Sequence, residues 1–142
     1  MTTEKGVPVV YLVPVGRFFF SAIFLMTVLG HFSPAYIGYA AQQGVPAAAF
    51  LVPLSGVIAT LGGLSVTFGY KAKFGAWLLV LFLVPVTLTM HNFWAVTDPM
   101  MRGMQMAMFM KNVSMLGAAL LITHFGAGPL SLDARRTPPQ GV

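Results

Sequence analysis

Residues 47–68 read AAAFLVPLSGVIATLGGLSVTF, and residues 74–93 read FGAWLLVLFLVPVTLTMHNF. Neither stretch contains Asp, Glu, Lys or Arg, and neither alternates between apolar and polar residues as a half-buried strand does. About 20 apolar residues suffice for a helix to cross the hydrocarbon core of a bilayer. Because backbone amides in lipid have no water to bond to, each stretch is predicted to be a membrane-spanning helix.

Two further apolar stretches flank this pair. The sequence predicts one transmembrane domain over residues 1–132, an all-α antiparallel bundle with four spanning helices at about 9–32, 47–68, 74–93 and 99–125. Residues 133–142 are polar and Pro-rich and are expected to be a disordered tail. The composition agrees, since 57% of the 142 residues are hydrophobic and 8% are charged, against about 25% charged in soluble domains.

Prolines mark the ends of two predicted helices. Ser33-Pro34 is expected to end the first helix, because the residue before a proline is pushed out of α geometry. Asp98-Pro99 is typical of an N-cap followed by a proline in the first turn. Residues 33–46 are then expected to be a loop on the outer side.

The basic residues predict the orientation in the membrane. With four spans, both termini lie on one side. That side would carry six basic residues and the other side two, so the positive-inside rule favours cytoplasmic N- and C-termini. The six are Lys5, Arg17, Lys71, Lys73, Arg135 and Arg136, and the two are Arg102 and Lys111.

Composition also excludes several kinds of function. The chain has no cysteine, which rules out disulfides, thiol catalysis and Cys-based metal sites. Its net charge is +5, but the chain has too few basic residues to form a nucleic-acid surface. The positive excess fits contact with anionic membrane lipids. Asp98 is the only acid away from the termini, so no Ser-His-Asp set is plausible, and no catalytic residue is assigned.

Two cations lie inside apolar runs. Arg17 directly precedes three phenylalanines, and Lys111 follows Arg102 by nine residues in the fourth predicted helix. A charge at such a depth is costly and is a candidate functional group. No acid falls within a predicted span, so the counter-charge must come from lipid phosphate, backbone carbonyls, a ligand or another subunit. The alternative is that both side chains snorkel to the headgroups.

Polar and aromatic residues gather at the predicted outer ends of the helices. A quinone head group needs donors of this kind beside an apolar channel for its tail, so a quinone is the cofactor considered. The alternative interpretation is an aromatic and polar belt at the level of the headgroups. The candidate binding residues at these ends are His31, His91, Asn92, Trp94, Lys111 and Asn112, and Arg17 is a further candidate.

Six methionines crowd into residues 100–110. Thioethers are soft ligands that suit Cu(I), and His91 could join them. Spacing by two distributes most of them around a helix, however, and methionine also packs well at adaptable surfaces. No pair of histidines has the i, i+4 spacing of a metal site, so no metal is expected.

Small residues recur along the second predicted helix. Ser55, Ala59 and Gly63 are spaced by four and therefore share one face. Such a stripe lets helices approach closely in lipid. It favours packing inside the bundle, with a contact between two copies of the chain as the alternative.

Several short motifs, taken together, resemble the DoxX family over about residues 13–132. The match is carried by Gly16-Arg17-Phe18 at the start of the first helix, Leu61-Gly62-Gly63-Leu64 with Gly69 at the end of the second, the turn Tyr70-Lys71-Ala72-Lys73, His91-Asn92-Phe93-Trp94, and Phe109-Met110-Lys111-Asn112 running into Met115-Leu116-Gly117. No single motif is diagnostic. The ordered set is the basis of the resemblance.

The resemblance implies a four-helix protein of the bacterial inner membrane, often tied to redox complexes. It favours an accessory or quinone-associated subunit of a membrane redox system, with redox-complex subunits or a second copy as partners. Members often carry a glutamate where this chain has Ala59, which leaves any family activity open. The alternatives are a non-catalytic scaffold or assembly subunit, and a carrier of lipid or small hydrophobic solutes.

Overall fold

The structure is a computed structural model, and it describes residues 9–136. This part of the chain is helical, and no strand occurs within it. Its elements are η1 (Val9–Tyr11), α1 (Leu12–Met26), η2 (Val28–Phe32), α2 (Pro34–Gln42), α3 (Ala48–Phe68), α4 (Ala72–Met90), η3 (Phe93–Ala95), α5 (Pro99–Phe125) and α6 (Leu132–Arg136), where η denotes a 3-10 helix.

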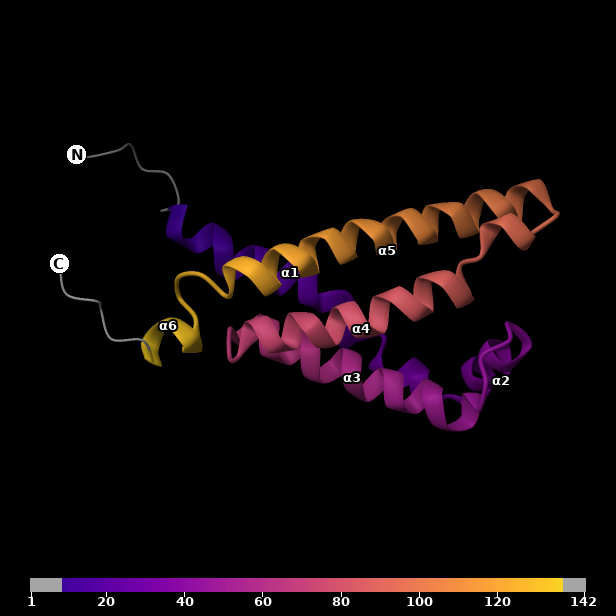
Figure 1. Cartoon of the computed structure of the whole chain (residues 1–142), viewed down its shortest axis with the longest axis horizontal. Helices are drawn as coiled ribbons and strands as arrows, with labels where there is room; N and C mark the ends of the chain where they lie inside the picture. The colour runs from indigo at the N-terminus through magenta and orange to yellow at the C-terminus, as the bar shows by residue number, and fades with distance from the viewer. Residues whose placement is uncertain (1–8, 137–142) are drawn as a thin grey trace.

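Four segments are long and apolar enough to cross a membrane, which confirms the predicted fold class of an all-α membrane protein with four spanning helices. α3 and α4 lie side by side and antiparallel, α5 packs along α4, and α1 packs on α3 (Figure 1). The short α3–α4 turn and α6 lie at the same end of the molecule, and α2 lies at the other end (Figure 1). The four segments are Val9–Phe32, Ala48–Phe68, Ala72–Ala95 and Pro99–Phe125.

The core lies where α3 and α4 approach each other most closely. Leu79 and Leu83 of α4 are completely buried there. A Cβ on Gly62 of α3 would lie 2.8 Å from the backbone oxygen of Gly75, and a Cβ on Gly75 would lie 2.2 Å from Oγ of Ser65. The two backbones can therefore meet only because both positions are glycine.

The predicted stripe of small residues lies elsewhere on α3 and packs inside the bundle. Ala59 is buried in the same core as Phe24 of α1. A Cβ on Gly63 would meet the side chains of Leu25 and Phe24. Ala59 and Gly63 therefore face α1, while Ser55 faces a space lined by α2, α3 and α4. The close contact with α4 uses a different glycine, Gly62.

The end of the first span differs from the prediction. α1 stops at Met26, and the chain continues as the tighter η2. Residues 34–42 were expected in a loop, and they form α2 instead. Ser33 caps this helix, since its hydroxyl accepts a hydrogen bond from the backbone N–H of Tyr36, and Pro34 occupies the first turn, where its missing N–H costs nothing. The prediction of a loop over residues 33–46 is therefore wrong for residues 34–42, which form a short helix.

The third and fourth spans differ in length. α4 ends at Met90, and η3 follows after a break. α5 begins at Pro99 with the predicted cap, because the Asp98 carboxylate accepts a hydrogen bond from the N–H of Met101 (2.8 Å). The first turns of α5 pack against η3, so α5 extends past the end of α4.

The predicted disordered tail also differs in its first part. Residues 132–136 form α6, and the Asp133 carboxylate accepts hydrogen bonds from the backbone N–H groups of Lys71 (2.7 Å) and Ala72 (2.9 Å). Its own backbone N–H donates to the carbonyl of Gly69 (2.8 Å). α6 is thus attached to the α3–α4 turn. The remainder of the predicted tail, residues 137–142, lies outside the described residues.

Candidate functional site

Arg17 lies at the end of the bundle that carries α6. It is buried, with an exposed fraction of only 5%. Its guanidinium donates hydrogen bonds to the backbone carbonyls of Ala127, Pro129 (3.3 Å) and Leu130 (2.7 Å), and it interacts electrostatically with Asp133. Of the sources of counter-charge that the sequence allows, backbone carbonyls are the one observed. Snorkelling does not describe this residue.

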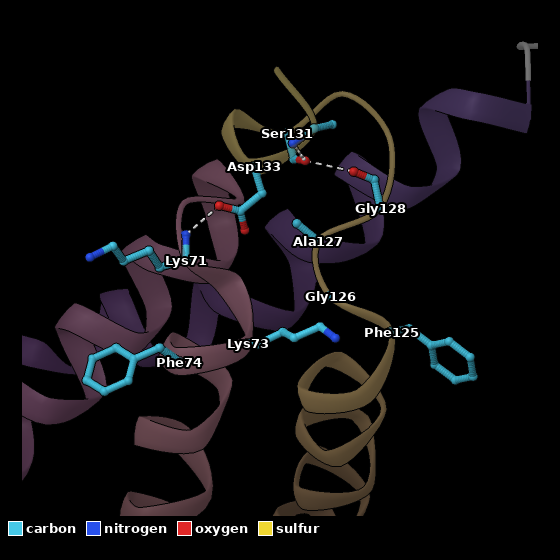
Figure 2. A pocket seen from close by; sticks show the side chains of 10 residues that line it. Lys71, Lys73, Phe74, Phe125, Gly126, Ala127, Gly128, Ser131 and Asp133 are labelled. Atoms are coloured by element: carbon cyan, nitrogen blue, oxygen red, sulfur yellow. Dashed lines mark hydrogen bonds between the residues drawn. The ribbon is translucent and has the colours of Figure 1, made fainter. Parts of the chain in front are cut away.

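The segment bound by Arg17 forms one wall of a cavity of about 510 Å³ (Figure 2). Ser131 closes the segment on itself by donating to the carbonyl of Gly128 (2.7 Å). The side chain of Lys73 lies beside Gly126, and the rings of Phe74 and Phe125 point away from the cavity (Figure 2). We call residues 126–136 the C-terminal latch, because they join α1, the α3–α4 turn and the end of α5.

Lys111 differs from Arg17, because its side chain is exposed. It lies twelve residues after Pro99, which is about 18 Å at 1.5 Å per residue. It lines a cavity together with His91, just past the end of α4, and with Phe82 and Leu83 of α4 itself. The depth of Lys111 in the membrane stays a prediction.

Four of the predicted site residues meet around one small cavity at the α2 end. This cavity, the polar cavity below, has a volume of about 100 Å³ and contains no acidic residue in its lining. The four are His31 from η2, His91 from the end of α4, and Lys111 and Asn112 from α5.

Several polar groups of the polar cavity have no protein partner. Asn112 has an exposed fraction of only 3%, yet its side-chain amide makes no hydrogen bond with any residue of 9–136. Nδ1 of His31 lies 2.9 Å from the carbonyl of Thr27, and a carbonyl only accepts, so Nδ1 carries a proton. Nδ1 of His91 lies 2.8 Å from Oε1 of Gln105. In the neutral rings, Nε2 is then left as an acceptor.

An apolar groove adjoins the polar cavity. It has a volume of about 380 Å³ and is lined by α2, α3 and α4. His31, Tyr36 and Phe82 line both spaces, and the ring of His31 lies edge-on to Tyr36 with the centroids 5.4 Å apart. Burial raises the pKa of the Tyr36 phenol, which keeps the hydroxyl protonated at neutral pH. We call this space the α2 groove.

Gly56 holds His31 in place at this junction. A Cβ on Gly56 would lie 2.5 Å from Cβ of His31. We expect Gly56→Ala to push η2 outward and to remove His31 from the polar cavity. The measurement is the ¹³C–¹⁵N correlation spectrum of the histidine side chains. It should show a shifted His31 and unchanged His124, whereas an unchanged His31 signal would contradict the packing.

Three predicted site residues lie outside this cavity. Arg17 belongs to the C-terminal latch at the other end. Trp94 is 55% exposed, with its ring against Phe93 and Phe109, and Asn92 is half-buried just before η3. The structure therefore groups His31, His91, Lys111 and Asn112 and separates the rest.

Three residues that line both spaces, Tyr36, Phe82 and Val86, were not among the predicted site residues. A detectable signal existed for Tyr36, since Ser33-Pro34 is also a helix start and would have placed Tyr36 on a helix. Nothing local distinguishes Phe82 from the other apolar residues of α4.

The six methionines of residues 100–110 are exposed on the projecting part of α5. Within residues 9–136, no group of three or more His, Cys, Asp or Glu side chains is placed to hold a metal ion. Nδ1 of His91 is hydrogen-bonded to Gln105, and His91 lines the polar cavity.

The chain is similar to two known proteins. It is 34% identical over 80 residues to the ER-derived vesicles protein ERV29 of Saccharomyces cerevisiae, covering 56% of this chain but 26% of that protein. It is 28% identical over 99 residues to the inner membrane protein YphA of Escherichia coli, covering 70% of each. This chain therefore spans about a quarter of the yeast relative. No solved structure matches.

These comparisons overturn the DoxX resemblance, and with it the role of a quinone-linked redox subunit. The motifs behind that resemblance have structural explanations in this fold. Gly62 allows the α3–α4 contact, and Arg17 binds the C-terminal latch, while Ala59 fills a tightly packed core with 1% exposure. The model of the SURF4 family matches residues 41–137, which is more than half of the chain. The protein therefore belongs to the SURF4 family.

Proposed function

We propose that the protein is a membrane-embedded receptor that holds an apolar segment of another polypeptide in the α2 groove. The observation that carries the proposal is the junction of this groove with a cavity in which the Asn112 amide has no hydrogen-bond partner among residues 9–136. The groove volume of about 380 Å³ lies within the range of about 300–1,000 Å³ typical of ligand sites. Its lining is almost entirely apolar, with a few polar groups at one end.

A polypeptide fits these groups better than a lipid tail. A segment that enters the membrane without being helical brings backbone N–H and C=O groups that need partners. The Asn112 amide and the Nε2 acceptor of His31 are partners of this kind. Pro85 adds another, because it lacks the N–H that the carbonyl of Leu81 would otherwise bind, and both residues line the groove.

The family relationship supports the same role. The yeast relative is named for vesicles derived from the endoplasmic reticulum, and a membrane protein that binds client proteins is well suited to such vesicles. That relative is much longer than this chain, so its role is transferred here only as part of the proposal. Binding a client requires no catalytic group.

We further propose that the membrane is the inner membrane of a bacterium and that the basic end of the bundle faces the cytoplasm. The similarity to the E. coli inner membrane protein, which extends over 70% of each chain, supports the location. The positive-inside rule supports the orientation, because Lys71, Lys73, Arg135 and Arg136 lie at the α6 end. The α2 groove then opens toward the outer side.

Site-specific photo-crosslinking tests the receptor role. A photoreactive benzoylphenylalanine at Leu54, which lines the groove, should form adducts with one apolar segment of a client protein in intact cells. The same probe at Leu121, an exposed residue of α5 that lines neither space, should give lipid adducts. Mass spectrometry of the crosslinked peptides identifies the segment.

Filling the groove provides the specificity control. Ser55→Trp or, on the facing helix, Thr89→Trp places a large ring in the groove and should abolish the client adduct at Leu54. Using two positions on different helices guards against one variant that misfolds. Lipid adducts alone at Leu54, or a client adduct that survives both tryptophan variants, would show that the groove is not a receptor site.

A further inference from the structure

We infer that the polar cavity is a carboxylate-binding subsite, in which Lys111 and Asn112 bind a carboxylate of the client whose apolar part lies in the α2 groove. This inference rests on the proposed function and adds the chemical class of the group that is recognised. It is carried by the charge, the burial and the size of the cavity, and by its continuity with the groove.

The charge of the cavity is positive and is not neutralised locally. Lys111 is the only cation in the lining, and the lining holds no acid. Among the acids of residues 9–136, Asp98 lies thirteen residues earlier, about 20 Å along α5, where it caps the helix. Asp133 lies in the C-terminal latch at the opposite end. An occupant with a negative charge complements Lys111.

Asn112 supplies a second donor beside Lys111. Its side chain is buried to 97%, since 3% is exposed, and its amide finds no partner within the described chain. Its amide atoms are not among the fully buried, unpartnered atoms of the described chain, which are Nε of Arg17 and Oγ of Ser21, so they are open to the cavity and can bond to an occupant. A carboxylate offers two oxygens and accepts from the Lys111 ammonium and the Asn112 amide together.

The volume of the cavity limits the occupant to a compact group. About 100 Å³ is well below the roughly 300–1,000 Å³ of a whole ligand site, so the cavity suits one end of a ligand, such as a carboxylate with accompanying waters. Such waters would donate to the Nε2 acceptors of His31 and His91, which a carboxylate alone could not satisfy.

Continuity with the groove fixes the rest of the ligand. The two spaces share His31, Tyr36 and Phe82, so a molecule with its carboxylate at Asn112 extends past these rings into an apolar surface. A client segment with this arrangement carries an acidic side chain or a C-terminal carboxylate next to apolar residues.

Peptide binding to the full chain in nanodiscs tests the inference. The probe is an N-acetylated tetraleucine with a free C-terminal carboxylate, and the matched probe is the same peptide with a C-terminal amide. The carboxylate form should bind roughly 10- to 100-fold more tightly, the range expected for charge-assisted hydrogen bonds. Lys111→Gln should remove this preference. Arg102→Gln, a change of the same charge on α5 outside the cavity lining, should retain it.

The outcomes separate this inference from the receptor role. Equal binding of the two peptides to the wild type, or a preference that persists in Lys111→Gln, would overturn the carboxylate subsite while leaving the groove intact. Tighter binding of dodecyl phosphate than of the carboxylate peptide would overturn it as well. If neither peptide binds, the receptor role itself fails.

Discussion

Arg17→Met should release the C-terminal latch and lower the stability of the protein by roughly 2–4 kcal/mol. The guanidinium is buried and donates to three backbone carbonyls of residues 127–130. Buried hydrogen bonds to a charged group are worth about 1.5–3 kcal/mol each, and neighbouring bonds do not add fully. Leu130 also has a left-handed backbone with φ 51°, a conformation that costs about 1–3 kcal/mol and persists only while its carbonyl is held.

Thermal melting in detergent and limited trypsin digestion measure this effect. The melting temperature should fall by roughly 6–15 °C, and cleavage after Arg135 and Arg136 should become faster because α6 is no longer attached. Arg102→Met removes the same charge from an exposed position and should behave like the wild type. Arg17→Lys should be intermediate, since one ammonium cannot match the fork of a guanidinium. If Arg17→Met melts and is cleaved like Arg102→Met, the latch does not depend on Arg17.

Gly75→Ala should separate α3 from α4 and destabilise the protein by roughly 1–3 kcal/mol, the usual cost of overpacking a core. The added Cβ would lie 2.4 Å from Cβ of Ser65, so rotation of the serine side chain cannot relieve the clash and a backbone must move. The loss exceeds the gain of at most about 1 kcal/mol that alanine brings to a helix. Packing around Leu79 would loosen with it.

Gly117→Ala is the matched control. Gly117 lies in the middle of α5, and a Cβ there would meet nothing within 4 Å. This variant should keep or slightly raise the melting temperature, because it gains helix propensity without a clash. Equal melting temperatures for Gly75→Ala and Gly117→Ala would contradict the close α3–α4 contact.

Those parts of the fold that depend on local signals could be predicted from the sequence. Four apolar runs gave four spans, since length and hydropathy suffice in a membrane. Asp98-Pro99 was recognised as the start of a helix. Ser33-Pro34 has the same signature and was interpreted only as an end, so α2 was missed. The two signatures differ in the length of the helix that each begins, because residues 34–42 are too few to span a membrane and do not stand out as a helix.

Long-range contacts could not be predicted from the sequence. The bonds of Arg17 join residues 110 or more positions apart, and nothing local indicates that residues 127–130 fold back to α1. His31, His91, Lys111 and Asn112 were selected by residue type at one predicted end of the bundle, and the fold does bring these four around one cavity.

The family assignment shows a related limit. Gly-Gly pairs, a basic turn and aromatic residues at helix ends serve close packing and the membrane interface, so they recur among four-helix membrane proteins of different families. Here Gly62 and Gly75 are explained by their contact distances across the α3–α4 interface. Motifs of this kind therefore predicted the architecture well and the function badly.

The most direct test of the account is a density map of the chain purified from its native membrane with its partner bound. The account predicts continuous polypeptide density between α2, α3 and α4, extending past His31 and Phe82, with a carboxylate against Lys111 and Asn112. A map that shows only lipid tails in the α2 groove, with the Asn112 amide bonded to water alone, would contradict it.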